Sequence, residues 1–277
     1  MKITAIVENS VYNKHLWGEE GLSFLIESSD IKPVQILFDC GRSGTVAMHN
    51  LDVLDVDLNK VQYLILSHGH SGHIGGVMNI STALSESCIV LHPGIFCQKF
   101  KLTDNKIQPS GDQPALRKLK THYTFKIAEK PLWLSDTIVV SGKIPKDKNN
   151  IGLSNTHYFV KGYREIEPDL FEEELALGIK TNEGIVVLTA CAHRGLLNTI
   201  HYILSLFNGL PLFGIVGGFH LFDNEDATKK LIEQVKYLNP KVLAPCHCTG
   251  LISSATFYSA FPKEYHRFTT GDVIVFK

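Results

Sequence analysis

Histidines that follow apolar segments are the residues of this chain best suited to chemistry. His68, His70 and His73 stand in LSHGHSGHIGG, residues 66–76, directly after the apolar stretch VQYLIL. Imidazole is neutral near pH 7 and binds zinc and other borderline metals, and glycine lets the backbone turn tightly enough for neighbouring rings to converge. The stretch therefore predicts a metal site on a turn at the end of a strand. The alternative is a polar loop that binds no metal.

Three further histidines follow apolar segments in the same way. GIVVLTACAH ends at His193, PLFGIVGGFH at His220 and KVLAPCH at His247. Strand ends along one sheet edge are where α/β proteins collect functional groups, so residues far apart in sequence can meet there. Each histidine alone would more often be structural, but the repeated pattern favours a metal site. The other histidines lack this context, and they are His15, His49, His92, His122, His157, His201 and His266.

An aspartate and the cysteines complete the candidate residues. Asp39 ends the segment ILFD, where its carboxylate can orient a ligand histidine through the second ring nitrogen, or simply cap a turn or helix. The six cysteines lack the density of a disulfide scaffold and are interpreted mostly as buried thiols. In Cys246-His247-Cys248, side chains that alternate along a strand would point to opposite faces, which argues for His247 alone as a ligand.

The elements that must position these residues are strands alternating with helices. Helices are predicted at 195–207, 224–237 and 250–260; the second begins with acids and carries Leu231, Val235 and Leu238 at helical spacing. Two sheets with helices outside them are expected. Apolar runs rich in β-formers predict strands at 2–7, 22–28, 34–39, 61–67, 87–92, 121–128, 137–142, 176–181, 184–190, 212–218, 241–246 and 272–277.

The segment from about 99 to 170 is less regular and rich in turn formers. We expect one domain over residues 1–277 in which this segment is an insertion that covers a substrate, or else a surface excursion. The lysines and arginine of its second half could receive a phosphate or carboxylate, although each alone would more often be a solvated charge. They are Lys143, Lys146, Lys148, Lys161 and Arg164.

Charge and length exclude several classes of partner. The chain has 27 Lys and Arg against 28 Asp and Glu, mixed along its length, so no basic stripe for nucleic acid or an anionic membrane is expected. The N-terminal MKITAIVENS reaches Glu8 too soon for a secretory signal, and no run approaches a membrane-spanning length. We expect a cytoplasmic protein that acts on a small molecule; no oligomeric state follows from the sequence.

At this point the sequence resembles the metallo-β-lactamase superfamily, whose signature is His-x-His-x-Asp-His at a strand end. Within it the chain is similar to the branch of 7,8-dihydropterin-6-methyl-4-(β-D-ribofuranosyl)-aminobenzene-5'-phosphate synthase-like proteins. The resemblance implies a four-layer αββα sandwich, a mixed α/β fold, and zinc as one or two ions, with iron or manganese as alternatives. The motifs that carry it are EEGLSFLIE, ILFDCGRSG, LSHGHSGHIGG, SGKIP, TACAHRGLLNTI, VGGFHL and PCHCTG.

The family pattern assigns His68, His70 and His193 to the first metal. Three neutral imidazoles with an open fourth position are the arrangement that brings the pKa of zinc-bound water toward neutrality. The resemblance therefore implies a chemically competent first site. Asp39 is the residue expected to orient a ligand histidine of that site through its second ring nitrogen.

The second metal site departs from the family pattern. Relatives use the aspartate before the third histidine, that histidine, a bridging carboxylate and a late histidine; here His73 and His247 match, but the aspartate position is Gly72. The segment expected to supply the bridging acid offers His220, and Asp223 lies three residues beyond. The hypothesis is a second site that is weakened, empty, or rebuilt from His73, His220 and His247, whose nitrogen ligands favour zinc, copper, nickel or iron.

The resemblance implies a hydrolase acting on a phosphoester, lactone or similar small molecule, or a pterin-related transferase. Metal-bound hydroxide, or the metal as Lewis acid, would act on a carbonyl or phosphorus centre. His73 and His220 are the candidate proton carriers, and His247 also if it binds no metal. The alternative is a non-catalytic metal-binding or ligand-binding member with a degenerate second site. Oxygen or electron chemistry at iron is a third class, but a flavin domain has no room in this chain.

Overall fold

The computed structural model describes residues 1–28, 30, 32–84, 86–111, 113–120, 123, 125–146, 158–162 and 165–277. The chain divides into two compact units. Unit 1 comprises Met1–Glu129, Ser154–Glu173 and Thr269–Val275, and unit 2 comprises Lys130–Leu153, Glu174–Phe268 and Phe276–Lys277.

Unit 1 is built on a seven-stranded sheet in the order β17-β1-β2-β3-β4-β5-β8. Pairing is antiparallel from β17 to β3 and parallel from β3 to β8. The strands are β1 (Lys2–Val7), β2 (Ser23–Glu27), β3 (Gln35–Phe38), β4 (Val61–Ile65), β5 (Cys88–Leu91), β8 (Phe125–Ile127) and β17 (Val273–Val275).

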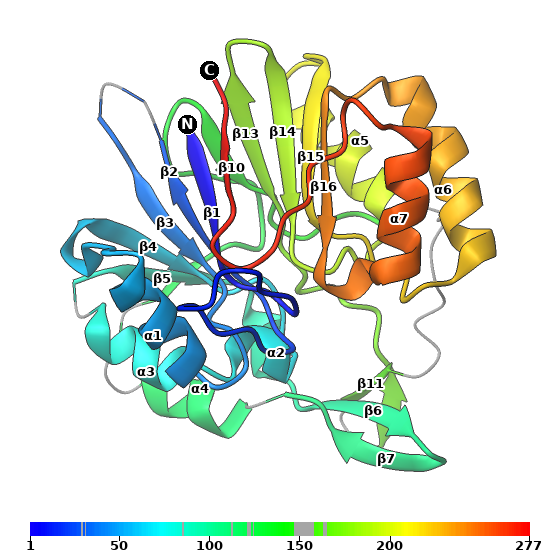
Figure 1. The fold of residues 1–277 in the computed structure, drawn as a ribbon. Helices are drawn as coiled ribbons and strands as arrows, with labels where there is room; N and C mark the ends of the chain where they lie inside the picture. The colour runs from blue at the N-terminus through cyan, green and yellow to red at the C-terminus, as the bar shows by residue number, and fades with distance from the viewer. Residues whose placement is uncertain are drawn as a thin grey trace. The chain divides into compact units, whose positions relative to one another are not determined.

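Helices cover one face of this sheet in the ribbon of unit 1 (Figure 1). Leu51, Ile80 and Leu116 from three helices pack with Leu64 and Leu91 of the sheet in one buried apolar cluster. The helices and 3-10 turns of unit 1 are α1 (Thr45–Val53), η1 (Leu58–Lys60), α2 (Ser71–Ile74), α3 (Val77–Ala83), η2 (Pro93–Phe96) and α4 (Gln113–Leu119).

A second, four-stranded antiparallel sheet of unit 1 lies in the segment predicted to be irregular. Its order is β12-β11-β6-β7, and a two-residue turn with Asp104 and Asn105 at positive φ joins β6 to β7, as hairpins of this length require (Figure 1). Its strands are β6 (Lys99–Thr103), β7 (Lys106–Pro109), β11 (Tyr158–Lys161) and β12 (Ile166–Pro168).

Unit 2 carries a six-stranded sheet in the order β16-β15-β14-β13-β10-β9. The pairs β14 with β15 and β15 with β16 are parallel, so the carboxyl ends of these three strands lie at one edge. Its elements are β9 (Leu132–Trp133), β10 (Ile138–Val140), β13 (Leu177–Thr181), β14 (Gly184–Thr189), α5 (Leu196–Leu206), β15 (Leu212–Gly218), α6 (Glu225–Leu238), β16 (Val242–Cys246), η3 (His247–Thr249) and α7 (Leu251–Ala260).

Helix α6 shows why the predicted helices form. The Asn224 side chain caps it by accepting from the Ala227 backbone N–H at 2.9 Å, and Asn239 ends it in the left-handed conformation. Leu231 and Val235 are buried in the core of unit 2, as their helical spacing predicts.

The predicted strands and the three predicted helices form, with bounds shifted by one or two residues for most of them. The strand predicted at 121–128 falls partly outside the described residues, and within it the structure describes β8 at Phe125–Ile127. Helices α1, α2, α3 and α4 were not predicted. Each has nine residues or fewer and buries few apolar side chains, such as Ala47 and Leu51 in α1, so helical periodicity hardly develops in their sequences. Among the described residues, every helix is too short or too polar to cross a bilayer.

Candidate metal centre

The buried carboxylate of Asp39 organises the histidine turn of unit 1. Asp39 follows β3 at φ 66° and accepts from the Ser67 backbone N–H at 2.7 Å and the Ser67 hydroxyl at 2.6 Å. Its Oδ2 also accepts from His73 Nδ1 at 2.7 Å. A proton on Nδ1 leaves the lone pair of His73 on Nε2, the nitrogen that could bind a metal.

The same carboxylate acts on His68 through Ser67. The Ser67 hydroxyl donates to Asp39 and accepts from His68 Nδ1 at 2.9 Å, which puts the lone pair of His68 on Nε2. That Nε2 lies 3.2 Å from Nδ1 of His70. Two nitrogens bound to one tetrahedral zinc at about 2.0–2.1 Å are about 3.3 Å apart, so this pair has the spacing of two ligands of one ion.

Buried side chains of unit 1 support the turn between these two histidines. Gln113 Nε2 donates to the Gly69 carbonyl at 2.8 Å, and a Cβ added to Gly69 would lie 3.2 Å from side-chain carbons of Lys99. The Phe171 ring meets His70 edge to face, with centroids 5.2 Å apart. A larger residue at position 69 would therefore require the side chains of Gln113 and Lys99 to shift.

Lys99 is itself held by two buried acids. Its Nζ lies 2.7 Å from Asp169 and 2.6 Å from Glu173, and all three side chains are buried. Burial lowers the pKa of Lys99, but the charges of Glu173 and Asp169 outweigh it and raise that pKa above its ordinary value. Burial raises the pKa of the Glu173 carboxyl, against the opposing effect of Lys99.

In unit 2 the loop after β14 presents His193. The buried Glu174 carboxylate accepts from the backbone N–H groups of His193 at 2.8 Å and Arg194 at 2.7 Å. The Arg194 guanidinium donates to the Ile144 carbonyl at 3.0 Å, and Ala192 adopts φ 60°. The loop is thus fixed by a carboxylate that sequence reasoning did not single out, although Glu174 stands in an acidic run directly before a strand.

The His220 loop lies beside His193. Their ring centroids are 4.1 Å apart, and His220, Phe222 and Asp223 all have positive φ. Asp223, the acid closest in sequence to the expected bridging position, accepts from the backbone N–H groups at the start of α7, at 2.8 Å from Ile252. Its carboxylate therefore caps a helix.

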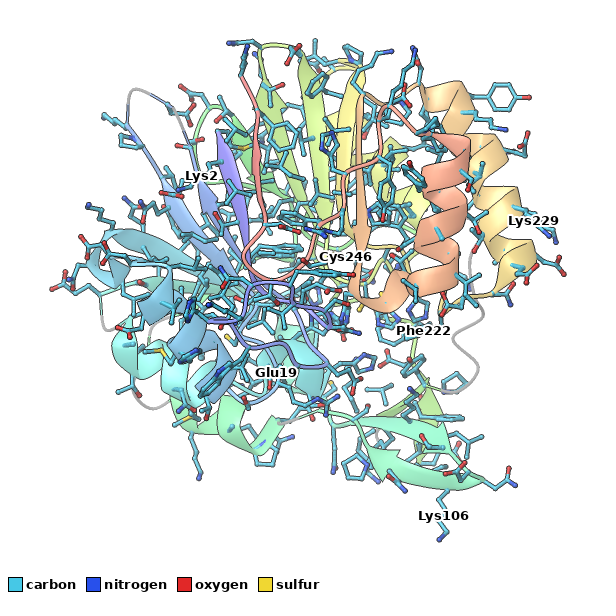
Figure 2. The ribbon with its side chains drawn as sticks, in the orientation of Figure 1. Lys2, Glu19, Lys106, Phe222, Lys229 and Cys246 are labelled. Atoms are coloured by element: carbon cyan, nitrogen blue, oxygen red, sulfur yellow. The ribbon has the colours of Figure 1, made fainter. Side chains whose placement is uncertain are left out.

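The premise that Cys246, His247 and Cys248 alternate along one strand is wrong, while the assignment of His247 as a metal ligand stays a prediction. The strand ends at Cys246, labelled in Figure 2, and His247 at φ 51° begins a 3-10 turn, so alternation along a strand does not apply beyond that point. Ligand atoms of Cys191, His247 and Cys248 all lie within 4.8 Å of one another. Burial raises the pKa of the Cys248 thiol, but contacts with Cys191 and His220 and the nearby His247 hold that pKa well below the usual range.

Gly72 is buried and has room for a Cβ atom. A Cβ there would lie 3.4 Å from Gly21 Cα and 3.6 Å from the Glu20 carbonyl, which are ordinary contacts. The neighbouring acids interact elsewhere, because Glu19 accepts from the Arg42 backbone at 2.9 Å and Glu20 pairs with the Arg42 guanidinium at 2.7 Å.

The structure gathers the predicted residues within each unit. Unit 1 brings Asp39, His68, His70 and His73 together, while unit 2 brings His193 beside His220. The assignment of these residues to metals or proton transfer remains a prediction. Of the predicted anion-binding residues, Lys143, Lys146 and Lys161 are exposed, and Lys148 and Arg164 lie outside the described residues.

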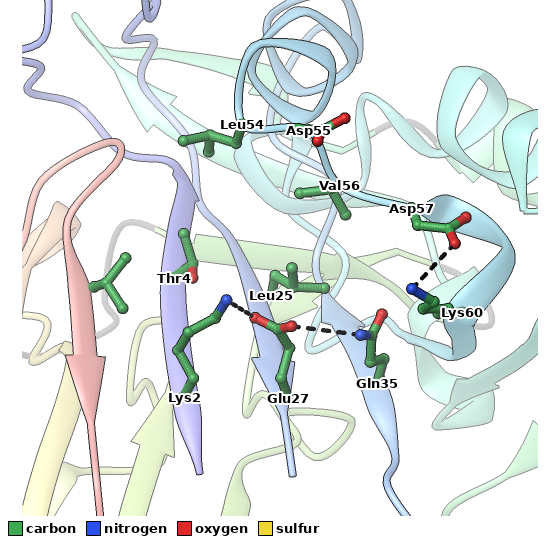
Figure 3. Close-up of a pocket in the computed structure, with 11 residues that line it drawn as sticks. Lys2, Thr4, Leu25, Glu27, Gln35, Leu54, Asp55, Val56, Asp57 and Lys60 are labelled. Carbon is green, nitrogen blue, oxygen red and sulfur yellow. Dashed lines mark hydrogen bonds and ion pairs between the residues drawn. The ribbon is translucent and has the colours of Figure 1, made fainter. Parts of the chain in front are cut away.

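A pocket of about 230 Å³ in unit 1 contains none of these histidines (Figure 3). Four of its charged side chains are paired, Lys2 with Glu27 and Lys60 with Asp57, the latter at 3.4 Å, and Asp55 lines it as well. Such paired surface charges leave little net field to attract a charged ligand.

Comparison with known proteins agrees with this architecture. A sequence model of the metallo-beta-lactamase superfamily matches residues 20–247. The chain is 28% identical to the 7,8-dihydropterin-6-methyl-4-(beta-D-ribofuranosyl)-aminobenzene-5'-phosphate synthase of Methanocaldococcus jannaschii, over 100% of this chain and 97% of the relative. It is similar to the crystal structure of Tm1679, a metal-dependent hydrolase of the beta-lactamase superfamily, with a TM-score of 0.82, 28% identity, and 99% and 98% of the two chains covered. Zinc-bound PqqB from Methylobacterium extorquens shares the fold alone, with a TM-score of 0.58, 9% identity, and 99% and 100% covered.

The fold and the side chains at its strand ends define a mixed α/β protein with histidine and cysteine groups that could hold a metal ion. The chain belongs to the metallo-β-lactamase superfamily. The predicted family and fold class are thereby confirmed.

Proposed function

We propose that this protein is a zinc-dependent enzyme that hydrolyses, or transfers a group to or from, a small phosphorylated or carboxylated molecule. The observation that carries the proposal is the pair of nitrogens on His68 and His70, 3.2 Å apart on a turn fixed by Asp39. His193 is the third proposed ligand, by the family pattern. The synthase relative supports group transfer and the Tm1679 likeness supports hydrolysis.

The donor set fits a divalent ion. Hydrogen bonding through Ser67 places the lone pair of His68 on Nε2, and the bond to Asp39 does the same for His73. When bound, the metal would supply Lewis acidity and lower the pKa of a water. In this chain, Asp39 fixes which ring nitrogens carry protons, and His73 and His220 are the proposed proton carriers.

The test is a panel of phosphoester, lactone, thioester and reduced-pterin substrates assayed with zinc, manganese and iron. We expect turnover of one class with zinc. For His68→Ala we expect a loss of at least about 100-fold in kcat/KM, because even residues that only orient a metal ligand contribute up to about that factor. His201→Ala is the matched control, because His201 is an exposed histidine on α5.

The competing candidate is a metal-binding protein without catalysis, which Gly72 favours because the family signature has an aspartate at this position. Metal bound through His68, with no turnover of any substrate class, would support that candidate against the enzyme. Equal activity of His68→Ala and the unaltered protein would contradict the ligand assignment.

A further inference from the structure

Two cysteines and a histidine of unit 2 meet at the carboxyl edge of its parallel strands. Cys191 follows β14, while His247 and Cys248 follow β16, and their ligand atoms lie within 4.8 Å of one another. Both cysteines are buried and His247 is half-buried.

The backbone is shaped to bring these side chains together. Strand β15 pairs with both β14 and β16, and its last residue, Gly218, lies between the two cysteine-bearing loops. A Cβ on Gly218 would come within 2.6 Å of Cys248 Sγ and 2.3 Å of the Ala190 carbonyl. Because Gly218 has no side chain, the Cys248 thiol can occupy this space. The thiol donates to the Cys191 backbone carbonyl at 3.6 Å.

We propose that Cys191, His247 and Cys248 together form a metal site, which binds zinc or another thiophilic divalent ion and keeps one coordination position open. Two sulfurs and one imidazole nitrogen form a set typical of zinc, and the hard cations magnesium and manganese prefer oxygen ligands. The open position would take water or a polar group of the substrate.

Charge favours this set over one made only of imidazoles. Cysteine binds metal as the thiolate, so Cys191 and Cys248 together compensate the two positive charges of the ion. A site of His73, His220 and His247 would have no such compensation, since Gly72 offers no carboxylate and Asp223 caps α7. The cysteines thus supply the negative charge that this chain lacks at the positions where the family pattern has acids.

The test uses cobalt(II) as a spectroscopic probe on the full chain. We expect a sulfur-to-cobalt charge-transfer band in the near ultraviolet that Cys191→Ala and Cys248→Ala each reduce by about half and that the double variant loses, together with one bound ion per chain. Cys246→Ala is the matched control, because Cys246 is a buried cysteine two residues from Cys248 that belongs to none of the candidate metal groups among the described residues.

His68→Ala separates this site from the proposed catalytic one. We expect His68→Ala to lose activity and keep the cobalt–sulfur band. The activity assay therefore tests the proposed function, and the band tests the cysteine site independently of it. A band that survives in the double cysteine variant, or bound cobalt without any such band, would overturn it.

Thiol labelling covers the case in which the variants do not fold. In the unaltered protein under reducing conditions, zinc should protect Cys191 and Cys248 from iodoacetamide, read peptide by peptide by mass spectrometry, and leave labelling of Cys97, the exposed cysteine, unchanged. Equal labelling of all cysteines with and without zinc, or a disulfide joining Cys191 and Cys248, would contradict the site.

Discussion

Gly72 is the single residue that most changes the chemistry expected of this chain. It stands where the family signature has an aspartate, and its hydrogen atom offers no ligand. Its surroundings would accept a Cβ in ordinary contact, and its φ is not in the left-handed region that favours glycine. Neither space nor backbone conformation therefore requires glycine here, so a carboxylate can be restored experimentally.

Gly72→Asp should raise the amount of metal held after dialysis, because it adds a charged ligand beside His73. Metal content per chain by mass spectrometry measures this. Gly72→Ala is the control, since it adds the same Cβ without the carboxylate. Equal metal content in the two variants would show that the position does not take part in binding.

At the scale of elements, the strand ends hold their histidines through partners on other elements. Asp39 after β3 positions His73 on α2, and Glu174 before β13 holds the His193 loop after β14. Lys99 at the start of β6 joins two acids of the segment after β11. These buried polar groups fix loops that apolar packing alone would leave in several conformations.

Glu174→Ala should weaken metal binding at His193, because it leaves the buried N–H groups of His193 and Arg194 without their acceptor. By analogy with other residues that orient ligands, we expect affinity to fall by about 10-fold or more, measured by competition with a zinc-sensitive dye. Glu183→Ala, at an exposed turn, should leave affinity unchanged. An unchanged affinity for Glu174→Ala would argue that His193 is not a ligand.

Lys99→Met should lower the free energy of unfolding of unit 1 by about 3–5 kcal/mol, because Asp169 and Glu173 would remain buried without their cation. Urea unfolding followed by circular dichroism measures the loss. Lys101→Met is the control, since Lys101 lies in the same strand but is exposed. A loss no larger than that of the control would show that this ion triad contributes little.

The same lysine predicts a pH dependence. The folded pKa of Lys99 is raised above the ordinary 10.5, so its contribution to stability is fully present below pH 10.5 and is lost as pH rises through the folded pKa. The unaltered protein should therefore lose stability in that alkaline range, and Lys99→Met should lose less. Parallel stability curves for the two proteins across that range would contradict the direction of the shift.

At the scale of the whole molecule, metal binding should stabilise the folded chain, since the proposed ligands are gathered only when it folds. An ion at 100 times its Kd adds about 2.7 kcal/mol to the folded state. Chelation should therefore lower the melting temperature, and zinc should restore it, whereas magnesium should not. Calorimetry before and after chelation measures this. An unchanged melting temperature after verified metal removal would count against tight binding.

The sequence alone predicted the strands of the two large sheets except β9, the three longest helices, the family and the candidate residues at the strand ends, but none of the strands of the four-stranded sheet. These follow from local information, because apolar alternation, helical spacing and turn residues each act over a few neighbouring positions. The short helices α1, α2, α3 and α4 were not predicted from the sequence, because they contain too few buried apolar residues to form a periodic pattern.

Only the tertiary structure decided which side chains meet. It joined Lys99 to Asp169 across 70 residues and Cys248 to Cys191 across 57, and it turned Asp223 toward α7. In the tertiary structure β16 ends at Cys246, before His247. His247 and Cys248 can therefore belong to one candidate metal group with Cys191. Strand order and the space left between packed elements, such as the space at Gly218, determine which side chains meet. Neither can be inferred from a short stretch of sequence.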